Sequence, residues 1–325
     1  MTVKLYRKSK RSKFIHNCKF IHRKPPKNSP YLGRFAPSPT GPLHYGSLVA
    51  AVASYLQARS NYGQWNIRIE DIDPARQARG SIQSILDTLN YFGFVSENPP
   101  ILQSSKENYH KHIATRLYEL GLAYSCICSR KDYSTTSEIG KMGLIYPGTC
   151  SAKQFPFSGN TNLRLRTQYE VIRFNDKHFG DQECEINSES GDYVIYRAEG
   201  LPSYILAASV DDVCEHYTEI VRGADLIDIT PRQIHLSNII FGVTQNFMHI
   251  PVITNQNGEK LSKQTHAPAL SKFHARSWLY YALTDLRQEP PKNLLWRPIW
   301  CTWDWAITHW QIENIPKQSS IVFDH

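Results

Sequence analysis

The sequence lacks any long apolar stretch. No uninterrupted apolar run in its 325 residues approaches the roughly 18 residues that a membrane helix needs, so we expect a cytoplasmic protein with no membrane partner. The composition also lacks the extremes of collagen-like, disordered and disulfide-scaffold proteins, because 41% of the residues are hydrophobic and 20% are charged. The length therefore predicts about two globular domains.

Acidic residues are absent from residues 1–30, which hold ten Lys and Arg residues. The rest of the chain, residues 31–325, holds 27 basic and 29 acidic residues, so the net charge of +8 belongs to this first segment. We interpret residues 1–30 as a flexible basic arm, and charge neutralisation also suits it to hold a polyanion. The arm lacks the apolar stretch of about 7–15 residues that marks a secretory signal.

The cysteines do not form the even set of a disulfide framework, because there are seven of them and no export signal. Three cysteines lie close together in the sequence, namely Cys126, Cys128 and Cys150. Thiolates are good zinc ligands, and structural zinc takes four ligands. The pattern predicts a zinc site whose fourth ligand is not a standard histidine. Three reduced thiols without a metal are the alternative.

Hydrophobic periodicity indicates an α/β fold. A short apolar run at 31–36 precedes a helical pattern at 48–56, an alternating strand pattern at 65–70 and a second helical pattern at 82–89. This order is typical of a parallel sheet, and similar signals return at 218–254. We therefore predict five segments, listed in chain order: a basic arm 1–30, the first half of a nucleotide-binding domain 31–100, an inserted zinc and acceptor module 101–200, the second half 201–265, and a short helical C-terminal segment 266–325.

Five tryptophans crowd the C-terminal segment, at positions 296, 300, 303, 305 and 310. Large aromatic side chains more often pack in a core than stack on RNA bases, although both uses are open. We expect these rings to form the core of a small helical segment.

Two polar segments carry the features of a nucleotide site. The stretch 34–47 runs from a strand through prolines and glycines into a helix, which points backbone N–H groups and the positive helix end toward a phosphate. His44 could donate to a phosphate oxygen and Gly46 allows close approach, although an ordinary turn with a capping histidine is the alternative. The loop around Lys260 and Lys263 offers compact charges for a phosphate chain, although exposed lysines are usually solvated surface.

These segments together resemble a known enzyme family. His44-Tyr45-Gly46-Ser47 and Lys260-Leu261-Ser262-Lys263-Gln264 are similar to the His-Ile-Gly-His and Lys-Met-Ser-Lys-Ser signatures of class I aminoacyl-tRNA synthetases. The stretch Arg68-Ile69-Glu70-Asp71-Ile72-Asp73 resembles the glutamyl subgroup. The resemblance implies a Rossmann-type parallel sheet, an inserted zinc-bearing module and a short helical C-terminal segment.

Length distinguishes two kinds of relative within this subgroup. A full glutamyl-tRNA synthetase continues past the lysine loop with a large anticodon-binding region, which the 62 residues after Lys263 are too few to form. The chain therefore most resembles short paralogues that activate glutamate without tRNA and attach it to the queuosine base of tRNA(Asp). A truncated glutamyl-tRNA synthetase that charges a tRNA 3′ end and a non-catalytic zinc and RNA-binding protein are the alternatives.

The resemblance also assigns roles to individual residues. His44 and Lys263 would be the catalytic residues, acting on the ATP phosphates. ATP, entering with Mg²⁺, would be bound by His44, Gly46, Lys260, Ser262 and Lys263. Glutamate needs cations for its carboxylates and an anion for its ammonium group, and its site would comprise Arg34, Phe35, Ala36, Pro37, Ser38, Glu70, Tyr204 and Arg222. Tyr146 would be the fourth zinc ligand beside the three cysteines. ATP, L-glutamate and queuosine-bearing tRNA(Asp) are the expected partners of a monomer.

Overall fold

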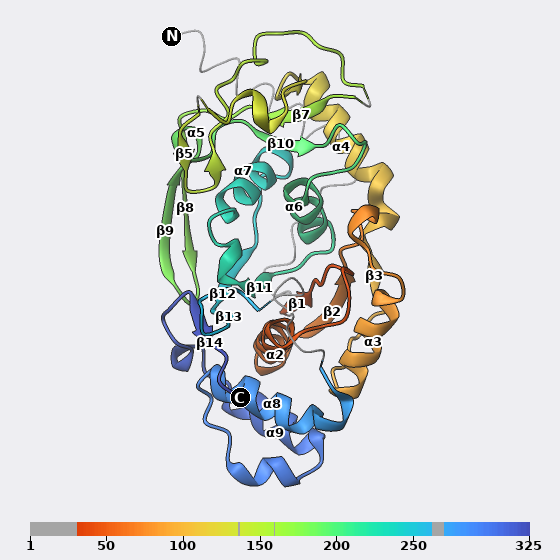
Figure 1. Ribbon diagram of the computed structural model, residues 1–325, viewed down its shortest axis with the longest axis vertical. Coiled ribbons are helices and arrows are strands. Elements are labelled where there is room, and N and C mark those ends of the chain that lie inside the picture. The colour runs from red at the N-terminus through yellow and green to blue at the C-terminus, as the bar shows by residue number, and fades with distance from the viewer. Residues whose placement is uncertain (1–30, 136, 159, 262–269) are drawn as a thin grey trace.

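The computed structural model describes residues 31–135, 137–158, 160–261 and 270–325. These residues form an elongated molecule with the C-terminal helices at one end and the inserted segment at the other, as Figure 1 shows. Within the described ranges, no helix is both long and apolar enough to cross a membrane.

The first strands of the chain form a parallel sheet. β1 (Leu32–Phe35) pairs in parallel with β2 (Gln64–Ile69), and β2 pairs in parallel with β3 (Ile101–Leu102). α2 (Tyr45–Ser60) connects the first two strands and α3 (Ser81–Tyr91) connects the next two. α2 buries most of its surface because apolar residues lie all around the helix, and Leu48, Val52 and Leu56 among them recur at helical spacing. The predicted strand and helix order is confirmed.

The second half of the fold completes this sheet. Its elements are α6 (Tyr204–Cys214), β11 (Glu219–Gly223), α7 (Thr230–Ile240) and β12 (Asn246–Ile250). β11 and β12 are parallel, and the N–H of Thr218 donates to the carbonyl oxygen of Leu32 at 2.9 Å, which places β11 beside β1 (Figure 1). The carboxyl ends of strands from both halves therefore meet at one edge, where ligands of such sheets bind.

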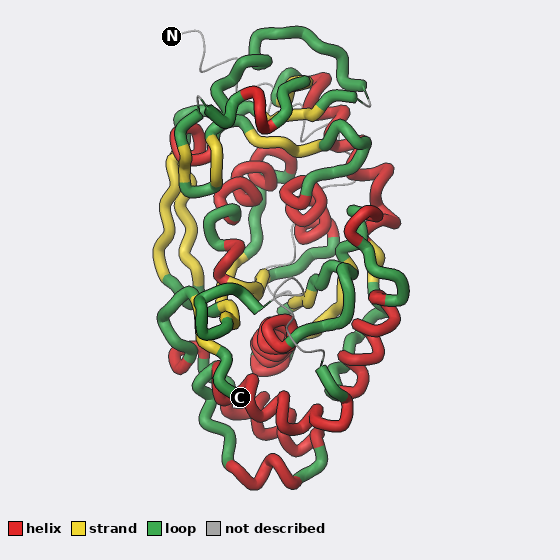
Figure 2. Tube along the Cα trace, viewed as in Figure 1, coloured by secondary structure: helices red, strands yellow, loops and turns green. Residues whose placement is uncertain are grey.

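An antiparallel module lies between the two halves. It contains α4 (Glu107–Glu119), β4 (Ala123–Cys126), β5 (Ile139–Gly140), β6 (Gly143–Leu144), β7 (Asn162–Leu165) and β10 (Tyr193–Tyr196), with β7 between β4 and β10. A ribbon of β8 (Val171–Asp176) and β9 (Gly180–Glu185), followed by α5 (Ile186–Ser190), extends from this module. Figure 2 shows the ribbon running along one side of the molecule to the parallel sheet. There Asp176 pairs with Phe247 of β12.

The C-terminal segment packs against α2. Its regular elements are α8 (Ala275–Asp285), α9 (Ile299–His309) and β14 (Ser320–Val322), and β14 pairs in parallel with β13 (Val252–Thr254). Trp303 is buried with α2 in the main hydrophobic core, as expected of the tryptophan cluster. Trp296 and Trp300 depart from that expectation, because they are 81% and 62% exposed. The predicted segment boundaries stay predictions.

Candidate active site and metal centre

The N-terminus of α2 brings the two signature segments together. His44 precedes the helix, and its Nδ1 accepts a hydrogen bond from the backbone N–H of Ser47 at 3.3 Å. A Cβ atom at Gly46 would lie 3.6 Å from the carbonyl oxygen of Leu261, the residue that follows Lys260. The helix N-terminus and the start of the lysine loop therefore border the same space, although more than 200 residues separate them in the sequence.

Lys260 forms an ion pair with Asp225, whose Oδ2 lies 2.6 Å from the lysine Nζ. Both side chains are partly exposed, so a phosphate chain can compete for this lysine. Ser262 and Lys263 lie outside the described residues.

A buried network of charges lies around the predicted glutamate ligands. Arg34 donates from Nε and Nη2 to the two carboxylate oxygens of Asp212, at 3.1 and 3.3 Å. Arg68 approaches Asp212 to 2.7 Å, Glu70 to 3.2 Å and Glu215 to 3.4 Å. All five side chains are at most 9% exposed. Two arginines and three carboxylates thus fix each other's positions at the carboxyl ends of β1 and β2.

This network shifts the pKa values of two carboxyl groups in opposite directions. Burial alone would raise the pKa of Asp212, but the adjacent Arg34 and Arg68 lower it below its ordinary value. Burial also raises the pKa of Glu70, and here Arg68 and Arg34 offset the increase only in part, so the pKa stays above its ordinary value. Asp212 is therefore a fixed anion, whereas Glu70 shares Arg68 with Asp212 and Glu215 and is suited to receive an ammonium group.

Arg222 lies on the neighbouring strand and points its guanidinium at Tyr204. Its Nη1 donates to the hydroxyl of Tyr204 at 3.2 Å, and its Nη2 donates to the Thr230 hydroxyl at 2.7 Å. Arg222 is 6% exposed, and these two contacts come from α6 and α7. A buried, always charged side chain held beside a tyrosine hydroxyl is suited to bind a carboxylate.

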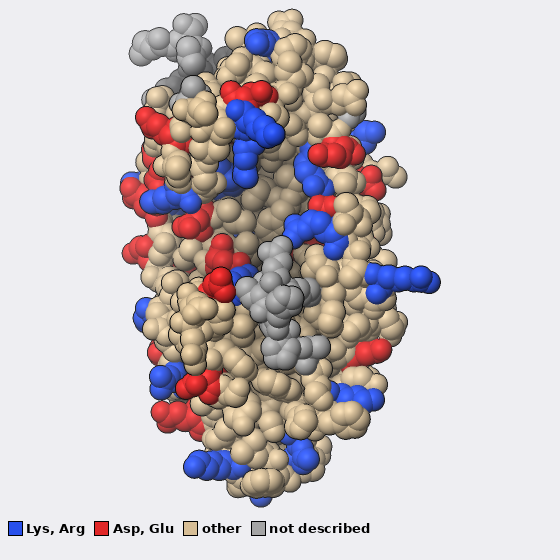
Figure 3. Space-filling view, in the orientation of Figure 1, with Lys and Arg blue, Asp and Glu red and all other residues tan. Residues whose placement is uncertain are grey.

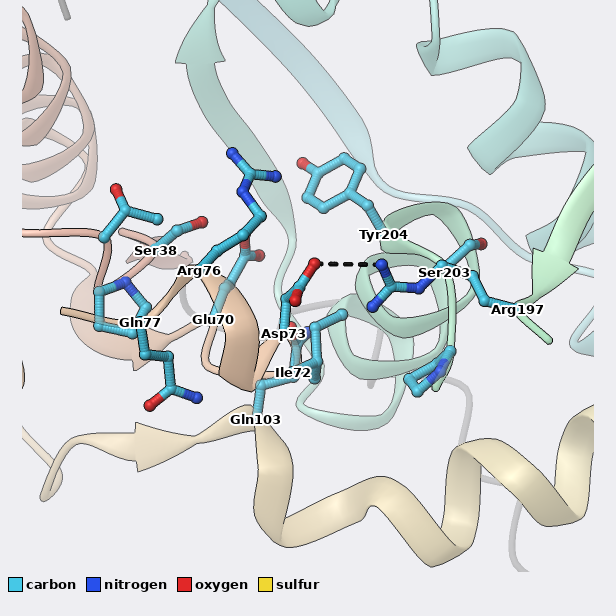
Figure 4. A pocket seen from close by; sticks show the side chains of 13 residues that line it. Ser38, Glu70, Ile72, Asp73, Arg76, Gln77, Gln103, Arg197, Ser203 and Tyr204 are labelled. Carbon is cyan, nitrogen blue, oxygen red and sulfur yellow. Dashed lines mark hydrogen bonds and ion pairs between the residues drawn. The ribbon is translucent and has the colours of Figure 1, made fainter. Parts of the chain in front are cut away.

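A pocket of about 200 Å³ opens between these residues and solvent, and its lining includes Ser38, Glu70 and Tyr204. Figure 4 shows Asp73 and Arg197 pointing toward each other at this pocket, where their ion pair spans 3.1 Å. Figure 3 shows Lys and Arg side chains on both sides of a hollow in the upper half of this face of the molecule. Such a rim suits a phosphate-bearing partner.

The remaining predicted glutamate ligands occupy different surroundings. The carbonyl oxygen of Pro37 accepts a hydrogen bond from the backbone N–H of Glu70 at 3.0 Å, which fixes the early stretch beside Glu70. The ring of Phe35 stacks on Trp65 in the hydrophobic core, with ring centroids 6.4 Å apart, and Ala36 is half-buried. The structure therefore brings together Arg34, Ser38, Glu70, Tyr204 and Arg222, while the Phe35 side chain packs in the core.

The cysteines predicted to bind zinc form a compact cluster. The thiol sulfurs of Cys126, Cys128 and Cys150 all lie within 4.8 Å of one another, and those of Cys128 and Cys150 are 3.5 Å apart. The hydroxyl oxygen of Tyr146 lies 3.3 Å from the sulfurs of both Cys126 and Cys128. Tetrahedral zinc separates two thiolate sulfurs by about 3.8 Å, so these four donors fit one ion.

The surroundings of this cluster place a cation beside Cys126 and Tyr146 and favour the thiolate of Cys150. Arg164 donates from Nε to the sulfur of Cys126 at 3.3 Å, and its guanidinium lies 3.8 Å from the centre of the Tyr146 ring. Burial alone would raise the pKa of Cys150, but hydrogen bonds from Tyr146, the Ile127 backbone and the neighbouring thiols lower it to about 7. The donor set is therefore one that a soft divalent metal can hold.

Comparison with known proteins identifies the fold. Residues 32–284 match the family of class I tRNA synthetases (E and Q), catalytic domain. The chain belongs to this family. It is 43% identical over 289 residues to the glutamyl-Q tRNA(Asp) synthetase of Aromatoleum aromaticum, covering 89% of the chain and 91% of that protein. It is also 43% identical over 297 residues to the protein of the same name from Dechloromonas aromatica, covering 91% and 99%.

Solved structures share the fold. A glutamate tRNA ligase from Elizabethkingia meningosepticum, in complex with its amino acid, matches with a TM-score of 0.74 and 20% identity, over 91% of the chain and 67% of that protein. The predicted class I synthetase fold is thus confirmed, as is the identification with the glutamyl subgroup.

The structure brings to the site residues that the sequence left without a role. Arg68 on β2 stands two positions before Glu70, the residue that follows the strand, so the period of two in a strand gave a signal that both face the same side. Asp176 and His249 carried no such signal, because the pairing of β11 with β12 sets His249 beside Arg222 and the pairing of β8 with β12 sets Asp176 beside His249.

Proposed function

We propose that this synthetase-family chain activates L-glutamate with ATP in the absence of tRNA and then transfers the glutamyl group to the queuosine base of tRNA(Asp). The observation that carries the proposal is the 43% identity to glutamyl-Q tRNA(Asp) synthetases along nearly the whole of both chains. Glu70 and Tyr204 line one pocket, Arg222 donates to the Tyr204 hydroxyl and Arg34 acts on Glu70, and this grouping supports the choice of glutamate.

The charges of the site match the charges of glutamate. Arg222 and the Tyr204 hydroxyl bind one carboxylate, and Glu70 binds the ammonium group. Arg34 adds positive charge from the other side of the site, but Asp212 holds two of its nitrogens, so its role is to orient and to attract. An amino acid substrate with an uncharged side chain, in place of glutamate's second carboxylate, would leave a buried cation of the site without a partner. The site therefore selects glutamate.

Activation requires positioning and charge stabilisation, without a protein nucleophile. The α-carboxylate oxygen of glutamate attacks the α-phosphorus of ATP, the bond to the bridging oxygen breaks, and pyrophosphate leaves. Mg²⁺ enters as part of the MgATP substrate and offsets charge on the phosphates. His44 and the N–H groups at the start of α2 hold the phosphate chain. Lys260 leaves its ion pair with Asp225 and pairs with a phosphate of this chain instead.

The second step uses the pocket beside Tyr204. A hydroxyl of queuosine's cyclopentenediol attacks the carbonyl carbon of the mixed anhydride, and AMP leaves with the electron pair of the broken bond. Asp73, Arg76 and Arg197 line the outer part of this pocket, where the acceptor nucleoside and its phosphates would enter.

We further propose that Cys126, Cys128, Cys150 and Tyr146 hold a structural zinc ion. The distances within the cluster and the cationic Arg164 support this assignment. When bound, zinc would cross-link β4 to the loop that carries Cys150 and so stabilise the module that faces the RNA.

The identity of the base that accepts glutamate is tested with an RNA that lacks the 3′ end to which amino acids are attached. The anticodon stem–loop of tRNA(Asp) is prepared with queuosine and, as the matched control, with guanine at the wobble position. The proposal predicts that radiolabelled glutamate becomes attached to the queuosine form alone. Glutamate attached only to full-length tRNA, whichever base stands at the wobble position, would instead identify an enzyme that charges the 3′ end.

A further inference from the structure

A buried chain of hydrogen bonds ends on Arg222. The carboxylate Oδ2 of Asp176 lies 2.6 Å from Nδ1 of His249, and Nε2 of His249 lies 3.0 Å from Nε of Arg222. Asp176 and His249 are 0% exposed, and Arg222 is 6% exposed. The three residues come from β8, β12 and β11, so the chain crosses three adjacent strands.

The arginine fixes the position of the imidazole proton. The guanidinium is always charged and its Nε carries a hydrogen, so Nε2 of His249 must accept. The imidazole proton therefore resides on Nδ1 and is donated to Asp176. Backbone N–H groups of His178 and Phe179 also donate to Asp176, at 3.0 and 2.9 Å, and they hold its carboxylate in place.

We propose that Asp176 and His249 are positioning residues that set the orientation of the substrate-binding guanidinium of Arg222. Asp176 selects the histidine tautomer, the unprotonated Nε2 anchors Nε of Arg222, and Nη1 is thereby aimed at Tyr204 and the glutamate carboxylate. Thr230 accepts from Nη2 of Arg222 at 2.7 Å, and its hydroxyl oxygen lies 3.2 Å from Nε2 of His249. The role of Arg222 in this inference rests on the proposed function.

The surroundings keep the imidazole neutral. Burial lowers the pKa of His249, Asp176 raises it and Arg222 lowers it, and the outcome is a pKa of about 4. The groups that face the ring are Asp176 from β8, Arg222 from β11 and Thr230 from α7, while Asp225 acts from farther away. Protonation of Nε2 would place its N–H against the Nε–H of Arg222 and break the hydrogen bond that anchors the guanidinium. The anchor is therefore intact at neutral pH.

Kinetics of three variants test the proposal, with glutamate-dependent exchange of pyrophosphate into ATP as the assay. His249→Phe removes the acceptor but keeps a ring, His249→Gln keeps an acceptor oxygen, and His235→Phe removes another buried histidine as a control. Loss of a hydrogen bond to a charged group predicts that His249→Phe raises the KM for glutamate roughly ten- to hundredfold, with a much smaller change in the KM for ATP.

We expect a smaller rise for His249→Gln and a KM near that of the wild type for His235→Phe. A wild-type KM for glutamate in His249→Phe would overturn the proposal. An equal rise of both KM values, shared by His235→Phe, would overturn it as well, because that is the effect of a structural role alone.

Nitrogen NMR of histidine-labelled protein provides a test that does not depend on the substrate. The signals that disappear in His249→Gln belong to His249, and we expect them to report a neutral ring with its proton on Nδ1 at pH 6. A proton on Nε2, or a ring that titrates near the ordinary histidine pKa, would overturn the proposal. If the wild type shows no exchange with glutamate but the NMR result holds, the proposed function fails while the arrangement of His249 and Arg222 stands.

Discussion

Replacement of Asp212 by asparagine tests the buried charge network most severely. The change removes one negative charge from a site where Asp212 contacts Arg34 at 3.1 Å and Arg68 at 2.7 Å. Removing one member of a buried ion pair costs about 3–5 kcal/mol, and the contacts of Arg68 with Glu70 and Glu215 place this variant near the lower end. We expect the free energy of unfolding to fall by about 3 kcal/mol.

The matched control is Glu183→Gln, which removes the same charge from an ion pair with Arg173 whose two side chains are 60% and 69% exposed. Such an exposed pair contributes at most about 1 kcal/mol. Urea unfolding followed by circular dichroism gives the midpoint for each variant. Asp212→Asn should also raise the KM for glutamate, because the amide offers Arg34 one acceptor oxygen where the carboxylate offers two.

The stability difference should depend on pH in one direction. Because the folded state lowers the pKa of Asp212, its ionised carboxylate stabilises the fold fully above the ordinary pKa near 3.8 and loses this effect as the pH falls further. The difference between wild type and variant should thus be full at pH 7 and shrink below about pH 4. An Asp212→Asn midpoint equal to that of Glu183→Gln, with an unchanged KM for glutamate, would refute this reasoning.

Two further predictions concern Glu70 and the cysteine cluster. Burial raises the pKa of Glu70, and only its ionised form binds an ammonium group, so calorimetric affinity for glutamate should weaken as the pH falls from 7 through the raised pKa of this carboxyl. An affinity that is flat over this range, or one that Glu70→Gln leaves intact, would contradict that role. Cys150→Ser should abolish the zinc that atomic emission detects in the purified protein and lower its melting temperature, whereas Cys184→Ser, at a buried thiol outside the cluster, should retain the metal. Equal zinc content in both variants would exclude Cys150 as a ligand.

Local sequence patterns predicted the elements of the parallel sheet and both signature segments. Apolar residues at helical spacing specify α2, and prolines and glycines before His44 specify the turn into it. The cysteine spacing likewise predicted a cluster that the structure brings within 4.8 Å. These features depend on short stretches of chain, so the sequence alone can reveal them.

The features that the sequence did not predict depend on long-range pairing. Asp176 lies in a region predicted as an inserted module, yet the ribbon that carries it returns to β12 and places its carboxylate on His249. Periodicity does not reveal which distant strand a ribbon will join. The exposure of Trp296 and Trp300 also escaped prediction, because their spacing did not show which side of the C-terminal segment packs on α2.

The central claim is that the chain activates glutamate without RNA, and glutamate-dependent exchange of pyrophosphate into ATP tests it most directly. The account predicts exchange by the RNA-free wild type and its loss in Lys263→Ala, the lysine that the family signature assigns to the phosphates. Exchange that begins only when tRNA is added would contradict tRNA-independent activation. No exchange under either condition, from folded protein, would contradict the assignment of an activating enzyme.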